Sequence, residues 1–146
     1  MTDVELPADV VVVVDVANVM GSRPDGWWRD RRAAARSLLT AFGQLPGLQT
    51  VGPDGRQLRI ARVVAVLEGA ARGAAAPDSV DVVEAERDGD STIVAVTGEL
   101  VASGLASETE SAPLVLVVTA DRGLRERLPG TAQIAGPQWL NELIGR

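Results

Sequence analysis

The sequence predicts an α/β domain of three layers, in which helices cover both faces of a mainly parallel, five-stranded sheet. Short apolar runs alternate with stretches of helical periodicity, which is typical of such a sheet. The first run, 10–16, is almost entirely valine, as expected for a central strand buried on both faces. With 146 residues and no internal repeat, we expect one domain over 1–146, with its core at about 9–146 and a short tail at 1–8.

The elements follow from apolar periodicity and from turn and capping residues. In chain order, the sequence predicts a strand at 10–16, a loop at 17–26, a helix at 27–42, a loop at 44–59, strands at 58–67 and 80–86, a helix from about 90 to 103, a polar loop, a strand at 114–118, a short helix at 122–128, a strand at 131–135 and a final helix from Pro137. The connection 68–79 is short for a parallel crossover, so the direction of the third strand stays open.

Capping residues and apolar spacing support each helix. Asp25 is placed to cap the helix at 27–42 and Gly43 to end it, while Asp90 or Ser91 can cap the next helix. Each of the three longest helices has one apolar face: Trp28, Ala35, Leu39 and Phe42 in the first, Ile93, Thr97, Leu100 and Val101 in the second, and Trp139, Leu140 and Leu143 in the last.

The composition excludes several kinds of chemistry. Without histidine or cysteine there are no serine–histidine triads, no disulfides and no zinc sites built from those residues. Catalysis must then use carboxylates, hydroxyls, amides and arginine, which suit hard cations such as Mg²⁺ or Mn²⁺. The longest apolar run is too short to cross a bilayer and the acidic N-terminus lacks a signal-peptide pattern, so we expect a cytoplasmic protein with no membrane partner.

The charge pattern is mixed. A net charge of −6 argues against a general coating of nucleic acid, because such binding depends on neutralising phosphates. All 14 basic residues are nevertheless arginine, and they cluster at 23–36 and 122–127. Arginine suits phosphate recognition, although a GC-rich genome would also favour it.

Acidic residues fall at the carboxyl ends of the predicted strands, where open parallel sheets bind ligands. Asp15 lies near the end of the first strand, Glu68 just past the second and Asp121 just past the fourth. Asp88 and Asp90 follow the third strand. Asp90 and Asp121 are equally well placed to cap helices, but a carboxylate buried in a central strand, as Asp15 would be, needs a partner. Converging carboxylates repel one another unless a cation neutralises them, so the pattern indicates a divalent metal site.

Three segments resemble the NYN branch of the PIN-like nuclease superfamily, and most closely its YacP-like members. They are VVVVVDVANVMGS at 10–22, ERDGDSTIVA at 86–95 and VVTADRGLRERL at 117–128. The first is similar to the family's strand ending in Asp-x-x-Asn, the second to its acidic turn before a helix, and the third to its Val-Thr-Ser-Asp-Arg segment. Their order and spacing agree with the family, and the match covers most of the chain.

This resemblance implies a PIN-like domain with one or two Mg²⁺ or Mn²⁺ ions. It makes Asp15, Asp90 and Asp121 catalytic metal ligands, and Asn18 a residue that orients Asp15 or contacts substrate. Ser91 and Thr119 would hold the carboxylates or a bound water in place. Glu68 stands where relatives carry Phe-Asp-Ala, and Asp88 stands where relatives need no acid, so whether these two are ligands stays open.

We therefore expect a metal-dependent endoribonuclease, with RNA presented by a ribosome or another basic partner. The residues expected to contact RNA are Arg122, Arg23, Arg29, Arg32, Arg72 and Trp27, the last by stacking on an unpaired base while Trp28 lies in the core. The arginines are alternatively a solvated surface. The valine and alanine content also permits a homodimer.

Two other functions stay open. A nucleotide phosphohydrolase on the same fold would need less basic surface, which suits the charge of −6 better. A catalytically degenerate domain would bind RNA or a ribosome without cleaving. Haloacid-dehalogenase phosphatases are excluded because Ala17 stands where they need a second aspartate, and dinucleotide-binding dehydrogenases because no Gly-x-Gly-x-x-Gly follows the first strand.

Overall fold

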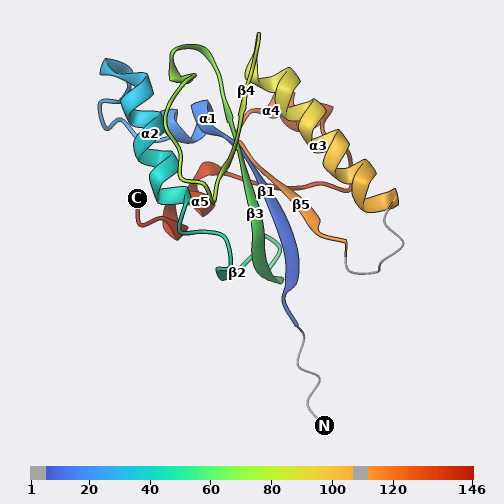
Figure 1. Ribbon diagram of the computed structural model, residues 1–146. Coiled ribbons are helices and arrows are strands. Elements are labelled where there is room, and N and C mark those ends of the chain that lie inside the picture. The colour runs from blue at the N-terminus through green and yellow to red at the C-terminus, as the bar shows by residue number, and fades with distance from the viewer. Residues whose placement is uncertain (1–5, 107–111) are drawn as a thin grey trace.

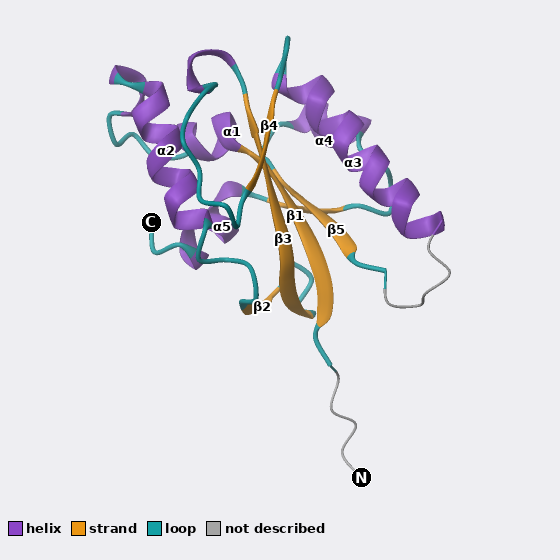
Figure 2. Ribbon diagram, in the orientation of Figure 1, coloured by secondary structure: helices purple, strands orange, loops and turns teal. Residues whose placement is uncertain are grey.

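Helices cover both faces of a twisted sheet whose strands run mostly in one direction (Figure 1, Figure 2). The computed structural model describes residues 6–106 and 112–146. Most of the predicted tail, 1–5, and the middle of the predicted polar loop, 107–111, lie outside the described residues. In the described part of the chain, no helix is long and apolar enough to cross a bilayer.

The sheet has six strands within the described ranges. They are β1 (Ala8–Asp15), β2 (Gln49–Val51), β3 (Gln57–Leu67), β4 (Asp81–Glu84), β5 (Leu114–Val118) and β6 (Gln133–Ala135). The order is β2-β3-β1-β5-β6, and β4 pairs with β3 beside this path. β2 is antiparallel to the start of β3, and β4 is parallel to its end, which settles the direction of that strand.

This arrangement confirms the predicted fold class and corrects the number of strands. Five strands were expected, and the sixth is β2, which lies inside the predicted loop at 44–59. It spans three residues, too few for any apolar alternation to stand out in the sequence. Pairing with the first residues of β3, rather than its own composition, makes this segment a strand.

The helices of the described residues are α1 (Val16–Gly21), η1 (Trp27–Arg29), α2 (Arg31–Phe42), η2 (Gly69–Ala71), α3 (Gly89–Ala106), α4 (Arg122–Arg127) and α5 (Pro137–Leu143), where η marks a 3₁₀ turn. Two of them, α1 and η2, were not predicted from the sequence. The predicted loop at 17–26 was wrong in its first part, because α1 starts directly after β1. The predicted helix at 27–42 is broken into η1 and α2.

Asp30 causes this break. Its backbone is extended, with φ −150° and ψ 92°, and its carboxylate accepts a hydrogen bond from Ala33 N at 3.0 Å. Asp30 therefore caps α2, and the prediction of Asp25 as the cap was wrong. Gly43 follows the last helical residue, as predicted.

The break also reverses the predicted environments of the two neighbouring tryptophans, Trp27 and Trp28. Trp28 was expected in the core, but it is 50% exposed. Trp27 packs against the core instead, and its ring meets that of Trp28 edge to face at 5.7 Å between centroids. The 3₁₀ turn puts both residues out of phase with α2, so the spacing to Ala35, Leu39 and Phe42 did not apply to them. Those three residues are buried, as predicted.

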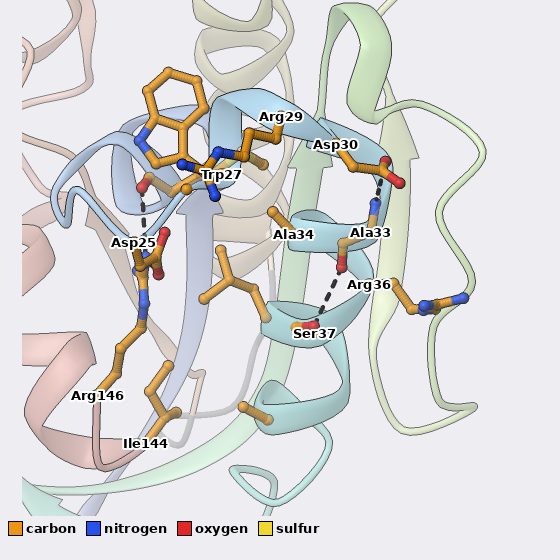
Figure 3. Close-up of a pocket in the computed structure, with 14 residues that line it drawn as sticks. Asp25, Trp27, Arg29, Asp30, Ala33, Ala34, Arg36, Ser37, Ile144 and Arg146 are labelled. Carbon is orange, nitrogen blue, oxygen red and sulfur yellow. Dashed lines mark hydrogen bonds and ion pairs between the residues drawn. The ribbon is translucent and has the colours of Figure 1, made fainter.

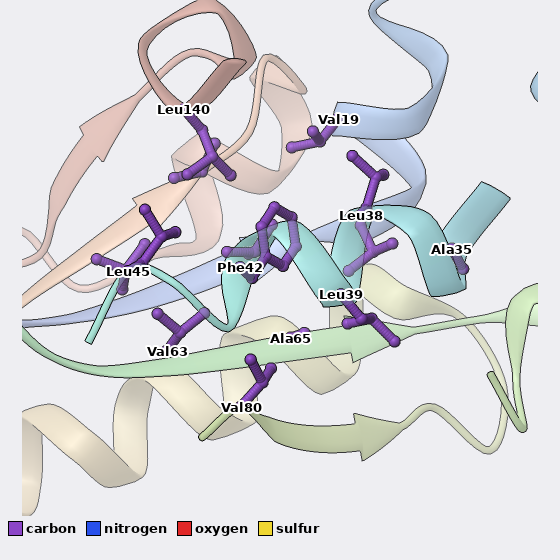
Figure 4. Close-up of a cluster of buried hydrophobic side chains, with 14 of the residues drawn as sticks. Val19, Ala35, Leu38, Leu39, Phe42, Leu45, Val63, Ala65, Val80 and Leu140 are labelled. Atoms are coloured by element: carbon purple, nitrogen blue, oxygen red, sulfur yellow. The ribbon is translucent and has the colours of Figure 1, made fainter. Parts of the chain in front are cut away.

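Two apolar layers form around β1 because its side chains alternate between the faces of the sheet. Val10, Val12 and Val14 join the layer beneath α1, α2 and α5, whereas Val11 and Val13 join the layer beneath α3 and α4. Figure 4 shows the first layer, where Phe42 and Leu39 of α2 lie over β3. All five valines are at most 6% exposed, which confirms β1 as a central strand.

Replacing the cap of α2 tests the break at residue 30. We expect Asp30→Ala to lower the free energy of unfolding by about 1 kcal/mol, because Ala33 N loses its acceptor. Asp30→Asn should stay close to wild type, since asparagine caps about as well as aspartate. Urea denaturation measures both. Equal stability of the alanine variant and wild type would contradict the assignment of this cap.

Candidate active site at the carboxyl edge of the sheet

Several segments that carry acidic residues lie at the edge of the sheet where the parallel strands end and α1, α3 and α4 begin (Figure 1). Asp15 is the last residue of β1, Glu68 follows β3, and Asp121 follows β5 by three residues. Asp90 lies in the first turn of α3. Parallel pairing of β1 with both β3 and β5 brings these segments to the same edge, as the sequence predicted.

Asp15 is the most enclosed of these carboxylates, at 7% exposure. Thr119 Oγ1 donates to its Oδ2 at 3.0 Å, and the backbone N–H of Asn18 donates to its Oδ1 at 3.3 Å. The second contact also caps α1, which explains why a helix starts directly after the strand. Both carboxylate oxygens are thus fixed from opposite sides.

Thr119 and Asn18 also hold the segment that carries Asp121. The hydroxyl of Thr119, besides donating to Asp15, accepts from Asp121 N at 3.2 Å. Asn18 Oδ1 accepts from Ala120 N at 2.8 Å. Asp121 itself caps α4 through a hydrogen bond from Leu124 N at 3.0 Å. The positioning role predicted for Thr119 and Asn18 therefore has a concrete basis, since the two residues connect the ends of β1 and β5.

Glu68 and Asp88 contact the start of α3. Glu68 Oε2 accepts from Gly89 N at 2.5 Å, and a side chain at position 89 would lie 2.6 Å from that same oxygen. Glycine at position 89 leaves room for this contact, and a larger residue there would displace the Glu68 carboxylate. Asp88 Oδ1 accepts from Ser91 N at 2.7 Å, so Asp88 is the capping residue at this end of α3, where Asp90 or Ser91 had been predicted.

The carboxylates of this edge influence one another electrostatically. Burial raises the pKa of Asp15 to about 6, with Asp90 and Glu68 adding to the rise against the hydrogen bonds from Thr119 and Asn18. Burial also raises the pKa of Asp90, and Asp121, Glu68 and Asp88 raise it further. The cationic side chains at this edge therefore do not fully neutralise the negative charge of its carboxylates.

Arg127 is a cation of this edge that the sequence analysis missed. Its Nη2 donates to Ser91 Oγ at 3.3 Å. The hydrogen bonds from Ser91, and to a smaller extent the charge of Arg127, lower the pKa of Asp88, and the same charge partly offsets the rise in the pKa of Asp90. Within the described part of the chain, Ser91 thus forms hydrogen bonds with Arg127 and Asp88 and with neither Asp15 nor Asp121. Arg127 ends α4, and only the packing of α4 beside α3 brings it here, so no spacing in the sequence indicated it.

The chemical groups at this edge are of the types that bind hard divalent cations. Carboxylates, a hydroxyl and a side-chain amide are the groups that Mg²⁺ and Mn²⁺ prefer, and the raised pKa of Asp15 reflects charge that a cation would offset. As the side chains stand, no three acidic groups within residues 6–106 and 112–146 are close enough together to hold one ion. The assignment of Asp15, Asp90, Asp121, Glu68 or Asp88 as ligands therefore stays a prediction.

The residues predicted to contact RNA are spread around this edge and beyond it. Arg122 is exposed directly after Asp121. Arg32 Nε donates to the backbone oxygen of Arg72 at 3.1 Å, which joins α2 to the segment after η2. Arg23 donates to the backbone oxygen of Arg146 at 3.0 Å. The remaining two, Arg29 and Trp27, line a pocket of about 410 Å³ beside α2 (Figure 3).

Comparison with known proteins supports the fold. The structure is similar to the crystal structure of a point mutant of Rae1 (YacP) from Bacillus subtilis, with a TM-score of 0.64 and 16% sequence identity. The match covers 92% of this chain and 74% of the other. No family profile matches the sequence, and no curated protein matches it either. The chain thus has a YacP-like fold, as its three segments had suggested.

The burial of Asp15 predicts an unusual pH dependence. A folded pKa of about 6 lies above the ordinary value of 3.8 for an aspartate, so the folded state takes up a proton between these values. Stability should therefore rise as the pH falls through 6, and the ionised group lowers stability at pH 7 by up to about 3 kcal/mol. In the presence of EDTA, Asp15→Asn should be more stable than wild type at pH 7.

Urea denaturation at pH 7 and pH 5 checks this expectation. The difference between Asp15→Asn and wild type should shrink at pH 5, where the wild-type carboxyl is mostly protonated. Asp54→Asn serves as a control, because Asp54 is exposed in the turn between β2 and β3. If Asp15→Asn is less stable than wild type at both pH values, the ionised carboxylate of Asp15 does not destabilise the folded protein, and the expectation is wrong.

Proposed function

We propose that this protein is a metal-dependent ribonuclease that hydrolyses RNA phosphodiesters at the carboxyl edge of its sheet. The observation that carries the proposal is Asp15, a buried carboxylate at the end of the central strand, whose pKa is raised by burial and, to a smaller extent, by the charges of Asp90 and Glu68. Such a group lowers the stability of the fold, and buried carboxylates with raised pKa values are concentrated at functional sites. The YacP-like fold and the resemblance of three segments to YacP-like nucleases support the same activity.

Asp15, Asp90 and Asp121 would hold one or two Mg²⁺ or Mn²⁺ ions, with Glu68 as a further candidate. Bound there, a divalent ion polarises a phosphate and lowers the pKa of a water. Neighbouring side chains hold these carboxylates in position. Thr119 and Asn18 fix both oxygens of Asp15 and hold the segment of Asp121 beside it. This preorganisation keeps Asp15 and the segment that carries Asp121 in place.

Arginines near the edge supply positive charge for the RNA backbone. Arg127 already lies beside Asp88 and Ser91, and the exposed Arg122 follows Asp121 directly. A guanidinium there can donate two hydrogen bonds to a phosphate. Because the whole chain carries −6, we also propose that a basic partner such as a ribosome presents the RNA. The absence of co-sedimentation with ribosomes at low salt would speak against that partner.

A second candidate function is hydrolysis of free nucleotides. The net charge of −6 favours it, because a small substrate needs less basic surface than an RNA strand. Release of phosphate or pyrophosphate from nucleoside triphosphates, without cleavage of RNA, would support this alternative. RNA binding that is independent of metal and without turnover would instead point to a degenerate binding domain.

Cleavage of labelled single-stranded RNA in Mn²⁺ or Mg²⁺ tests the main proposal. Wild type should cut, and EDTA should stop it, because the carboxylates cannot act on phosphate without a cation. Asp90→Asn and Asp121→Asn should each lower the rate by at least about 100-fold, if loss of one charged contact to the ion costs about 3 kcal/mol. Asp54→Asn, an exposed acid in the hairpin turn, should cut like wild type.

Cleavage that persists in both aspartate variants would place the chemistry elsewhere. No cleavage by wild type, together with unfolding curves that metal does not change, would remove the metal site. A metal that raises the unfolding temperature of wild type more than that of Asp121→Asn would support binding at this edge, since a ligand that binds only the folded state stabilises it.

Arg127 offers a separate test of the phosphate contact. We expect Arg127→Ala to lower the rate of RNA cleavage about tenfold, because one charged hydrogen bond is lost. Arg125→Ala is the matched control, since Arg125 is exposed on the same helix but two residues earlier, on another side. Single-turnover cleavage rates compare them. Equal loss in both variants would indicate a general charge effect rather than a specific contact.

A further inference from the structure

A second feature near the carboxyl edge is the pocket beside α2 (Figure 3). It has a volume of about 410 Å³ and lies between η1, the first three turns of α2 and the C-terminal turn after α5. Its floor is apolar, formed in part by Met20, Leu38 and Ile144. Its polar residues include Arg29, Arg36 and Ser37. The volume exceeds that of a single water site, so the pocket can admit an organic group.

Trp27 gives this pocket a rigid aromatic wall. One part of its side chain packs against the core, and the exposed ring of Trp28 supports it edge to face at 5.7 Å. The guanidinium of Arg31 lies over the Trp27 ring, 5.4 Å from its centre, as a cation–π contact. A tryptophan held in this way loses little freedom when a flat group stacks on it, and a nucleobase is such a group.

The charge around the pocket is opposite to that of the protein as a whole. Segment 23–36 contains five arginines and two aspartates, a local charge of +3 in a chain of −6. Both aspartates are already engaged: Asp25 pairs with Arg146 at 2.8 Å, and Asp30 caps α2. The exposed Arg29 and Arg36 at the pocket are therefore suited to bind phosphate.

The short helix α1 joins the pocket to the candidate active site. Asp15 caps one end of α1, and Met20, near its other end, lines the pocket. Six residues of helix span roughly 9 Å. A single RNA strand that passes the acidic edge can therefore reach the pocket within a few nucleotides.

We propose that this pocket binds one nucleotide of a single-stranded RNA substrate, with its base against Trp27 and its phosphates at Arg29 and Arg36. The inference rests on the proposed function for its substrate class and adds a binding site outside the acidic edge. It also assigns the base contact to Trp27 rather than to the more exposed Trp28, which does not line the pocket.

Filling the pocket tests this proposal without changing any charge. Ser37 is exposed on α2 and lines the pocket, whereas Thr40 is exposed on the same helix outside it. Their hydroxyls make the same kind of contact, to the backbone oxygens of Ala33 and Arg36. In EDTA, so that nothing is cut, Ser37→Phe should weaken binding of a labelled 12-nucleotide RNA about tenfold, about 1.4 kcal/mol. Thr40→Phe should bind like wild type.

Two further measurements complete the test. Arg29→Gln combined with Arg36→Gln should weaken binding and reduce its dependence on salt, and this variant decides the question if Ser37→Phe fails to fold. Uridine monophosphate should compete with the RNA only weakly; if it binds as tightly as the RNA, the pocket serves free nucleotides and the proposal is wrong. Equal RNA binding by Ser37→Phe, Thr40→Phe and wild type would also overturn it.

The outcomes separate this proposal from the proposed function. If Ser37→Phe binds RNA like wild type while wild type still cleaves, only the pocket assignment fails. If wild type does not cleave RNA but its binding depends on Ser37 and the two arginines, the pocket assignment stands and the nuclease proposal fails.

Discussion

The strand β1 is the element on which the rest of the structure depends. It pairs with β3 on one side and β5 on the other, and its valines supply both apolar layers. Because it is buried on both faces, its last residue enters the site from the interior of the protein. Asp15 is that residue, and its two hydrogen bonds from Thr119 and Asn18 connect the central strand to the segment after β5. The position of the site therefore follows from the packing of the core.

The ionised carboxylate of Asp15 lowers the stability of the folded protein. Burial, with a smaller contribution from neighbouring carboxylates, raises the pKa of Asp15 to about 6, so the ionised group is unfavourable at neutral pH. The same carboxylate would be an effective ligand for a cation, because a buried charge interacts more strongly than an exposed one. Thr119 and Asn18 hold this arrangement in place. A site of this kind is expected where function, rather than folding, selects the residue.

Charge is divided between two regions of the molecule. The carboxyl edge is acidic, whereas segment 23–36 beside the pocket carries a surplus of arginine. If the protein acts on RNA as we propose, this division would let the basic segment bind phosphates while the acidic edge attracts cations. The overall charge of −6 hides this division, and only the arrangement of α1 and α2 shows that the two regions are neighbours.

The fold class, the central strand and the carboxylates at the sheet edge could all be predicted from the sequence, because apolar runs and strand ends are local properties. It also pointed to Asn18 and Thr119, through segments that resemble a known family. Tertiary structure decided the rest. Strand pairing formed β2, an extended Asp30 broke the predicted helix and turned Trp28 outward, and helix packing brought Arg127 to Ser91. The strand β2 and the contact of Arg127 with Ser91 depend on pairing and packing between separate segments, which periodicity and spacing do not encode. The break at Asp30 rests on a local contact with Ala33, because an aspartate within a helical pattern can either continue a helix or cap a new one.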